Sequence, residues 1–474
     1  MQIKEIAYNY EIIQKNDKFL IIFGDKPFWF VCEESIVEII KYLSGKFDYE
    51  ILRNVLEKKY KYTNADISCL IQETSKMLEE AKLFTYENKS VTDRDMYNKH
   101  MPNPVINITK RCNLSCKHCY ADANFEIEEK EEMTLTEITS LIDSIIKRLP
   151  LVNSELKIML SGGEPFIRKD IFDIIKYIYD KGFIPAVNSN ALLINDIDMI
   201  LLKQYNVELL VSLDGSEKKT HEFIRGMNTY NKTIEKIKSL VTSEVNITIS
   251  MTVHNDNLNE VTSFIDLAIK LGIKKIAFNP INILDRADKM KLNRIRLSEY
   301  YKILEEKSKS SVEAFHLISE TDYANQGAIL LMNITFDYCG VGAASLVVDY
   351  DGSVYPCFNT MKKELKLGNI KDNDIFYIWE NSIILRGLRS LNVNNFSESC
   401  QKCCVKYYCG GGCRGEAYYK NKSLCSKCPY CSDIKESIIE FLFRISEGNN
   451  EIFLKKLTYY EKNKEFFLEY SKNH

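Results

Sequence analysis

The chain has 474 residues, of which 45% are hydrophobic, and its 63 Lys and Arg residues nearly balance 66 Asp and Glu residues, for a net charge of −3. This length allows two or three domains, and the near-neutral charge excludes a general basic surface for nucleic acid. No run approaches the roughly 18 consecutive apolar residues of a membrane helix, and residues 1–18 lack the organisation of a secretory signal. The sequence therefore predicts a cytoplasmic protein without membrane or nucleic-acid partners.

Residues 1–90 predict a small α+β domain with a winged-helix-like order of elements. Three strand-like runs come first, at residues 11–15, 18–24 and 27–34. Three helical patterns follow, at residues 35–46, 48–60 and 65–84. Ser35 is the expected N-cap of the first helix and Gly45 its expected end. Residues 91–103 are polar and predict a linker.

From residue 104 to residue 315, strand and helix patterns alternate strictly. Six strand-like runs lie at residues 104–109, 155–160, 183–190, 207–214, 245–253 and 273–281. Right-handed βαβ connections favour a parallel sheet for such an order. A closed barrel needs eight strands, so six predict a partial (β/α)6 TIM-like barrel that is open on one side. Its chemistry is expected at the C-terminal ends of the strands.

The fifteen cysteines gather in two places, three of them within residues 112–119 and ten within residues 339–431. In a reducing compartment such clusters indicate metal ligands before disulfides. Residues 316–435 are expected to form a further domain, and within it residues 337–431 are loop-rich, so bound metal is expected to stabilise them. Residues 436–474 predict terminal helices. Cys32 and Cys69 lie in apolar patterns and are expected in the core.

Cys112, Cys116 and Cys119 form a CxxxCxxC array directly after the first strand of the predicted barrel. Three thiolates can hold three irons of a [4Fe–4S] cluster and leave the fourth iron open for another ligand. A zinc site is the alternative, but it usually takes four ligands, and the position of His118 next to a cysteine suits a fourth ligand poorly.

This array, together with polar motifs at successive strand ends, resembles the radical S-adenosylmethionine (SAM) superfamily. Residues 161–165, SGGEP, resemble the family's GGE motif, in which a carboxylate meets the methionyl amino group of SAM. The resemblance implies ribose and carboxylate contacts at the ends of the third and fourth strands, and an arginine that pairs with the SAM carboxylate. The SAM-site residues that it implies are Tyr120, Gly162, Gly163, Glu164, Asn188, Ser189, Asn190, Ser212, Asp214 and Arg225.

The same resemblance implies reductive cleavage of SAM to methionine and a 5′-deoxyadenosyl radical, which abstracts hydrogen from an unactivated carbon of the substrate. The cofactor and the cluster carry that chemistry, and the protein orients them. A reductant such as flavodoxin or ferredoxin is the implied electron donor.

The second group of cysteines resembles the seven-cysteine pattern of the SPASM domain, which carries two auxiliary [4Fe–4S] clusters and would bring the total to three. One cluster would be held by Cys400, Cys403, Cys409 and Cys431. The other would be held by Cys339, Cys357 and Cys413, which leaves an iron open to a substrate thiolate. Three further cysteines, which could close that iron or replace Cys431, are Cys404, Cys425 and Cys428. A zinc ribbon is the alternative, because CxxC pairs are common zinc ligands.

The N-terminal domain resembles the peptide-recognition domain related to the peptide chaperone of pyrroloquinoline quinone biosynthesis. The resemblance implies that a leader peptide adds as an extra strand beside residues 27–32. A role in stability alone is the alternative, because fold analogy carries function poorly.

Together these features predict a radical SAM maturase of a ribosomally synthesised, Cys-containing precursor peptide that forms a thioether, as sactipeptide and ranthipeptide synthases do. One alternative is carbon–carbon crosslinking or oxidation of a Cys or Ser, as in sulfatase maturation. An alternative of another class is a zinc-containing, non-enzymatic peptide-binding protein. Asp and Glu are too numerous for the sequence to indicate a catalytic base.

Overall fold

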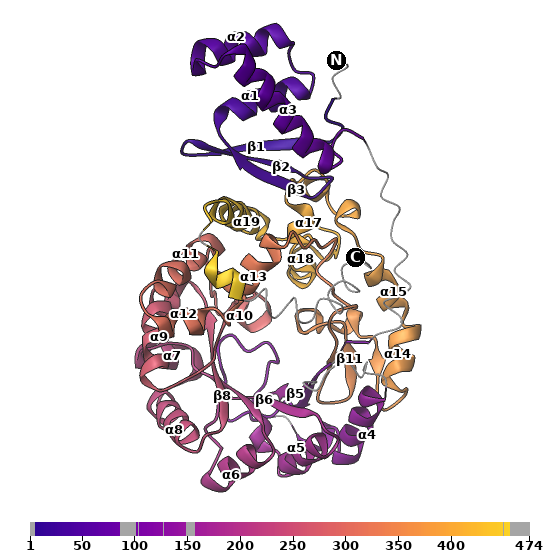
Figure 1. Ribbon diagram of the computed structural model, residues 1–474. Coiled ribbons are helices and arrows are strands. Elements are labelled where there is room, and N and C mark those ends of the chain that lie inside the picture. The colour runs from indigo at the N-terminus through magenta and orange to yellow at the C-terminus, as the bar shows by residue number, and fades with distance from the viewer. Residues whose placement is uncertain are drawn as a thin grey trace.

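The computed structural model describes residues 5–85, 101–102, 104–126, 128–147, 157–448 and 450–455. An N-terminal domain stands on a body in which a curved sheet is ringed by helices, and the C-terminal region continues that ring (Figure 1). Most of the predicted linker, residues 91–103, and most of the last predicted helix lie outside the described residues. No helix among the described residues is long and apolar enough to cross a membrane.

The N-terminal domain is a three-stranded antiparallel sheet covered by three helices, which confirms the predicted α+β order. Its strands run in the order β1-β2-β3, so β1 and β3 are the sheet edges. The elements are β1 (Tyr10–Lys15), β2 (Lys18–Phe23), β3 (Phe28–Cys32), α1 (Glu34–Leu43), α2 (Tyr49–Tyr60) and α3 (Asn64–Glu80).

Two details of this domain differ from the sequence predictions. Helix α1 begins at Glu34 with Glu33 at the N-cap, and Ser35 lies buried in its first turn, so the predicted cap was wrong. Cys69 is exposed on α3 with its thiol near Glu73, so the predicted core position was wrong as well. The predicted end of α1 is confirmed, because Gly45 follows the helix with a φ of +71°.

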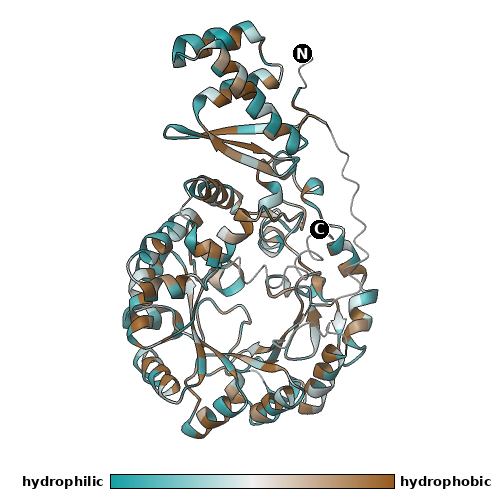
Figure 2. Cartoon of the chain, in the orientation of Figure 1, coloured by the Kyte–Doolittle hydropathy of each residue, from teal (hydrophilic) through white to brown (hydrophobic). Residues whose placement is uncertain are grey.

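The N-terminal sheet is buried on both faces. Ile21 and Phe23 of β2 belong to the core under the domain's own helices, whereas Leu20 and Ile22 belong to the core of the body. This division follows from the alternation of side chains along a strand. Helix α19 (Cys431–Ser446), an amphipathic helix beneath the sheet, supplies part of that second contact (Figure 2).

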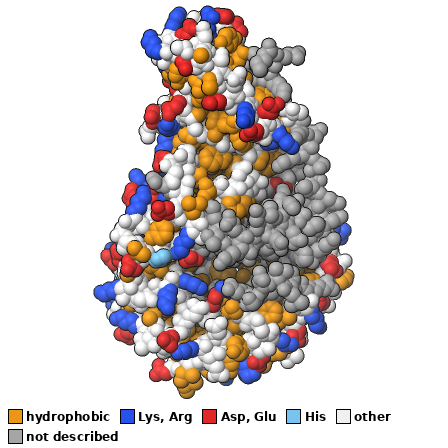
Figure 3. Space-filling model, viewed as in Figure 1, with side chains coloured by type: hydrophobic (Ala, Val, Ile, Leu, Met, Phe, Trp, Pro, Cys, Tyr) orange, Lys and Arg blue, Asp and Glu red, His pale blue; other side chains and the backbone are white. Residues whose placement is uncertain are grey.

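The turn between β2 and β3 lies against the cysteine-rich region. A side chain at Gly24 would place its Cβ 3.0 Å from the carbonyl oxygen of Cys403. Lys406 pairs with Asp25 at 2.6 Å. Figure 3 shows hydrophobic side chains gathered where the N-terminal domain meets the body, with both signs of charge scattered elsewhere on that face. The domain is therefore docked through backbone, ionic and apolar contacts.

The body confirms the partial (β/α)6 barrel. Six parallel strands lie side by side in chain order, with helices on the outside (Figure 1). The strands are β4 (Val105–Thr109), β5 (Lys157–Gly162), β6 (Ile184–Ser189), β7 (Glu208–Ser212), β8 (Asn246–Val253) and β9 (Ile276–Pro280). The helices are α4 (Leu135–Ile146), α5 (Ile171–Asp180), α6 (Asp196–Gln204), α7 (Lys218–Arg225), α8 (Tyr230–Thr242), α9 (Val261–Lys270), α10 (Asp285–Lys289), α11 (Leu297–Ser308), α12 (Val312–Ile318) and α13 (Asp322–Leu331).

Beyond the barrel, the chain adds three short strands to the same sheet. Strand β10 pairs in parallel with β4, and β11 and β12 follow in antiparallel order. The strands are β10 (Val347–Val348), β11 (Ser353–Tyr355) and β12 (Gly368–Asn369). The remaining helices are α14 (Ile375–Asn381), α15 (Ile383–Arg389), α16 (Glu398–Gln401), α17 (Lys406–Cys409), α18 (Arg414–Asn421) and α19. The domain boundary expected at residue 435 falls inside α19.

Candidate active site

The three-cysteine loop lies at the C-terminal ends of the barrel strands. Cys112 and Cys116 are buried, and Cys119 is half-buried. The loop is held from across the barrel mouth, because Lys117 N donates to Ile224 O at 2.9 Å and Arg286 donates to Cys116 O at 3.2 Å. Burial raises the pKa of Cys112 to about 12, so bound iron would have to drive thiol ionisation.

Gly162 and Gly163 let the loop after β5 pack directly on the backbone that precedes the first cysteine. A Cβ at Gly162 would lie 2.2 Å from Thr109 O, and one at Gly163 would lie 2.1 Å from Arg111 O. The space is filled by hydrogen bonds, since Gly163 N donates to Thr109 O at 2.8 Å and Glu164 N donates to Arg111 O at 2.9 Å. These contacts fix Glu164 beside the cysteine loop.

Glu164 is fully buried at the barrel mouth. Its carboxyl oxygens accept from the Ser189 hydroxyl and from Asn190 N, both at 2.8 Å, so residues at the end of β6 orient it. Burial raises the pKa of Glu164 to about 7. A buried carboxylate gains from a cationic partner, and the ammonium group of SAM is a fitting one.

Asp214, which follows β7, is also fully buried. It holds the cationic side chain of Arg225 on the other side of the cysteine loop. Burial opposes its ionisation, but Arg225 and His118 hold the pKa of Asp214 well below its usual range. It accepts from Arg225 Nε at 2.6 Å, from His118 Nε2 at 2.9 Å and from Thr252 N at 2.8 Å. Arg225 Nη1 lies 3.8 Å from Cys116 Sγ, so Asp214 positions the arginine against the cysteine loop.

The end of β6 presents an acceptor that has no partner among the described residues. Asn188 Nδ2 donates to the Ser161 hydroxyl at 3.2 Å, while Asn188 Oδ1 is buried and unpaired. Asn190 Nδ2 donates to Asn113 Oδ1 at 2.7 Å, which ties this strand end to the cysteine loop. Ser212 is half-buried at the end of β7. An unpaired buried acceptor fits a donor such as a ribose hydroxyl.

Three thiols, a buried carboxyl, an adjacent guanidinium and an unpaired acceptor thus converge on one mouth. This set fits a [4Fe–4S] cluster with three protein ligands and SAM on its open iron. The sequence had indicated all the residues that supply these groups, and the structure brings them together from the ends of β4, β5 and β6 and from helix α7.

The second set of cysteines falls into two groups, and the thiols interact electrostatically within each group. Cys413 interacts with Cys339 and Cys357. Cys409 interacts with Cys403 and Cys431, and Cys431 interacts in turn with Cys403 and Cys400. Cys409 also interacts with Cys428, so the second group contains one cysteine beyond the four that the resemblance implies.

The three extra cysteines take different positions. The thiol of Cys404 forms a hydrogen bond with Cys403 and faces Glu11 and Lys435, on the side of the N-terminal domain. Cys428 is buried beside Cys409, and Cys425 is exposed. Of the three, Cys428 is therefore placed to compete with Cys431. The electrostatic partners of Cys413, in the other group, are Glu416, Cys339 and Cys357, and none of these is one of the three extra cysteines.

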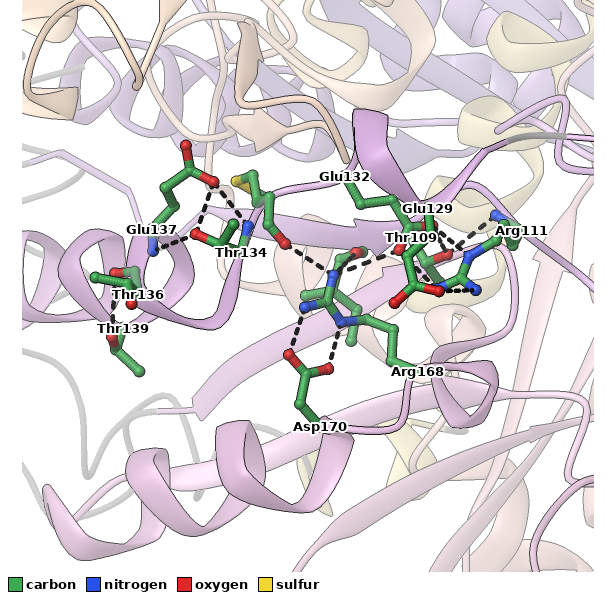
Figure 4. A network of polar contacts seen from close by, with 12 residues as sticks. Thr109, Arg111, Glu129, Glu132, Thr134, Thr136, Glu137, Thr139, Arg168 and Asp170 are labelled. Carbon is green, nitrogen blue, oxygen red and sulfur yellow. Dashed lines mark hydrogen bonds and ion pairs between the residues drawn. The ribbon is translucent and has the colours of Figure 1, made fainter.

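A buried ionic network supports the cysteine loop from below (Figure 4). Arg111, the residue before Cys112, donates to both carboxyl oxygens of Glu132 at 2.9 Å. Arg168, which follows the GGE loop, lies 3.5 Å from Glu132 and donates to the carbonyl oxygens of Ile108 and Met133. One carboxylate thus joins the segments that carry the cysteines and Glu164.

Sequence reasoning missed several residues of this site. His118 was weighed only as a zinc ligand, whereas it bonds to Asp214. Two more buried histidines, His221 and His254, lie near the same carboxylate. Burial lowers the pKa of His221 to about 4, so it is neutral. His118 lies in the cysteine loop, His221 in the first turn of α7 and His254 directly after β8, and no spacing in the sequence marks them.

Comparison with known families identifies the class of protein. Residues 106–268 match the radical SAM superfamily, and residues 339–404 match the SPASM iron–sulfur cluster-binding domain. The chain therefore contains a radical SAM domain that is followed by a SPASM domain. It is a radical SAM enzyme with a SPASM domain after its barrel, and this class uses SAM, a [4Fe–4S] cluster and auxiliary clusters.

Curated relatives carry two kinds of activity. The chain is 27% identical over 344 residues to the AdoMet-dependent heme synthase of Methanosarcina barkeri, which covers 68% of this chain and 94% of the relative. It is also 27% identical over 331 residues to the antilisterial bacteriocin subtilosin biosynthesis protein AlbA of Bacillus subtilis, which covers 68% of this chain and 70% of the relative.

Solved structures share the fold. SuiB of Streptococcus suis bound to S-adenosylmethionine matches with a TM-score of 0.56 and 15% identity, over 90% of this chain and all of the other. The enzyme anSMEcpe with bound AdoMet matches with a TM-score of 0.58 and 19% identity, over 73% of this chain and 98% of the other. The SuiB match is long enough to include N-terminal residues, since residues 101–474 alone are less than 90% of the chain.

Proposed function

We propose that this radical SAM enzyme modifies a ribosomally synthesised, Cys-containing precursor peptide and joins a Cys sulfur to a carbon atom in a thioether. The observation that carries the proposal is the open edge of the N-terminal sheet. Among the described residues, β3 has a strand neighbour on one side only. Both faces of the sheet are already covered, so the edge is what remains for a peptide.

An edge strand presents unpaired backbone donors and acceptors, and an extended peptide can add to them. All five residues of β3 are half-buried, which suits a strand that an added neighbour would shield further. The likeness to SuiB, which extends beyond the barrel and whose structure has been solved with its precursor peptide SuiA, supports this use of the domain. The likeness to the subtilosin protein AlbA supports a peptide substrate.

At the barrel mouth, the chain's own residues would hold SAM. Glu164 offers a carboxylate to its ammonium group, Arg225 offers a guanidinium to its carboxylate, and Asn188 Oδ1 accepts from its ribose. When the cluster is reduced, SAM bound to it would supply a 5′-deoxyadenosyl radical. The buried setting keeps water from the groups that bind the cofactor.

The thioether assignment depends on the first auxiliary group. Its three members, Cys339, Cys357 and Cys413, lie apart from Cys404, which faces the N-terminal domain. Three protein thiolates would leave room for one substrate thiolate on the cluster. The ring of Phe358, next to Cys357, lies 6.0 Å from the ring of Tyr120, so this group lies beside the SAM site.

The test is anaerobic reconstitution followed by reaction with SAM, dithionite and a Cys-containing peptide that carries its leader. A thioether removes two hydrogen atoms from the peptide and protects one thiol from alkylation, and 5′-deoxyadenosine accumulates. The same mass loss with the thiol still open to alkylation would indicate carbon–carbon crosslinking instead. Because heme synthases are among the relatives, an iron porphyrin is tested as a second candidate substrate. Turnover of the porphyrin in place of the peptide would overturn the proposal.

Leader docking has its own test by hydrogen exchange. A leader peptide is expected to protect the amides within Phe28–Cys32 that point away from β2, which are those of alternate residues, because they would bond to the added strand. The amides of β1, at the other edge of the same sheet, serve as the internal control and should exchange as before. Protection of β1 alone, or of neither strand, would contradict docking on β3.

A further inference from the structure

A chain of hydrogen bonds runs from the SAM site to the C-terminal region through five side chains. Asn188 Nδ2 donates to the Ser161 hydroxyl at 3.2 Å, and that hydroxyl lies 3.0 Å from the hydroxyl of Tyr120. The Tyr120 hydroxyl donates to Asn107 Oδ1 at 3.3 Å. Asn107 Nδ2 donates to Asp349 Oδ1 at 3.0 Å, and Asp349 directly follows β10.

Asp349, at the far end of this series of hydrogen bonds, determines which group donates in each bond. An ionised carboxylate only accepts, so the amide of Asn107 must turn its NH2 group toward Asp349 and its oxygen toward Tyr120. Tyr120 then donates to Asn107, and its oxygen is left to accept from Ser161. Ser161 in turn accepts from Asn188 Nδ2, which leaves Asn188 Oδ1 facing the site as an acceptor.

The backbone holds Asp349 where this chain needs it. Strand β10 pairs with β4 in the register Val348 to Ile106, which places Asp349 beside Asn107. The tight turn after β10 is closed by Asp349 N donating to Ser353 O at 2.8 Å and Gly352 N donating to Asp349 O at 2.9 Å. The carboxylate is therefore supplied by the C-terminal region but lies at the edge of the barrel sheet.

We propose that Asp349 is a positioning residue of the SAM site, which fixes the orientation of the Asn188 amide through Asn107, Tyr120 and Ser161. Without the carboxylate, the Asn107 amide has no fixed direction, and the bonds beyond it lose theirs. Asn188 then presents either oxygen or nitrogen to the cofactor. The C-terminal region thereby acts on SAM binding without touching SAM.

The test is SAM affinity of the reconstituted protein by equilibrium dialysis without reductant, so that no turnover occurs. Asp349→Ala and Tyr120→Phe are each expected to weaken binding roughly five- to tenfold, the effect of about one hydrogen bond. The double variant is expected to bind no more weakly than either single variant, because both break the same chain. Tyr350→Phe, which removes a neighbouring hydroxyl outside the chain, is the matched control and should bind SAM like the parent protein.

Two further readouts separate positioning from a structural defect. Iron per chain shows whether Asp349→Ala has disturbed the auxiliary clusters, and the KM for SAM should rise while kcat at saturating SAM is kept. Asp349→Asn retains an acceptor but can also donate, so its affinity should fall between those of the parent and Asp349→Ala. The proposal is overturned if the two single losses multiply in the double variant. It is also overturned if Tyr120→Phe binds SAM like the parent protein.

Discussion

The two cysteine-rich parts of this chain hold their thiols in opposite ways. The three cysteines of the barrel lie within residues 112–119, on one loop that is bonded to several strand ends. The seven predicted auxiliary ligands come from residues 339–431, where the strands have two or three residues and most helices have eight or fewer. The first set is placed by the fold, whereas the second must be drawn together across long loops. Closing such loops costs chain entropy that bound clusters offset.

The largest expected effect comes from removing a ligand that the fold already holds. Cys112→Ala should abolish 5′-deoxyadenosine formation, because the cluster loses one of its three protein ligands. The thermal unfolding of the barrel should change little, since the loop keeps its bonds to Ile224 and Arg286. Product formation by chromatography and melting by circular dichroism measure the two effects. Cys69→Ala, which changes an exposed cysteine, is the control and should retain activity.

Removing a predicted ligand of one auxiliary cluster should have the opposite pattern. With Cys409→Ala, amides within residues 339–431 are expected to exchange much faster, because that region depends on cluster ligation for closure. Amides of β5 and β6, at the centre of the parallel sheet, should stay protected. Hydrogen exchange with mass spectrometry reads both regions in one sample. Equal loss of protection in the barrel would mean that the two parts are not built differently.

The ionic network below the cysteine loop gives a test of intermediate size. Glu132→Gln should lower the free energy of unfolding by about 3 kcal/mol, because Arg111 loses its buried carboxylate partner, whereas Arg168 keeps its pair with Asp170. Urea unfolding measures the change. Glu129→Gln alters a pair whose carboxylate is 67% exposed, and it should cost less than about 1 kcal/mol. Similar losses in both variants would show that burial of the network does not matter.

The smallest effect is a dependence on pH. The pKa of Glu164 is raised to about 7 by burial, and only the ionised form pairs with the ammonium group of SAM. SAM affinity should therefore rise as the pH increases through 7, by up to about tenfold per pH unit below that value. Arg225, the nearby cation, stays charged throughout this range. Equilibrium dialysis between pH 6 and pH 8, as an approximate range around that pKa, should give a flat profile for Glu164→Gln.

The sequence indicated most of the barrel, because its strands are long apolar runs that alternate with amphipathic helices. It did not indicate β10, β11 and β12, since two or three residues carry no periodicity and these strands form only by pairing with distant segments. The same holds for the site. Local spacing marks Cys112 and Glu164, whereas Asn107 and Asp349 are 242 residues apart and meet only in the folded sheet.

Ser35 and Cys69 show the limits of local patterns in another way. Ser35 has the right side chain for a cap, but the helix starts one residue before it and buries it. Cys69 lies in a helix with an apolar stripe, yet it is on the face that points to solvent near Glu73. A shift of one residue at a helix start, or a rotation of one position around its axis, is below what periodicity can resolve.

The docking of the N-terminal sheet on the body would determine how far a bound leader peptide lies from the barrel mouth. Lys406 pairs with Asp25, Lys435 pairs with Glu11, and the turn at Gly24 lies against the cysteine-rich backbone. The sheet is therefore docked in one fixed position on the body. On the proposed function, a leader on β3 starts at a constant separation from the barrel mouth. An extended peptide advances about 3.3 Å per residue. The molecule would therefore act as a ruler, and the count of residues after the leader would select which carbon is reached.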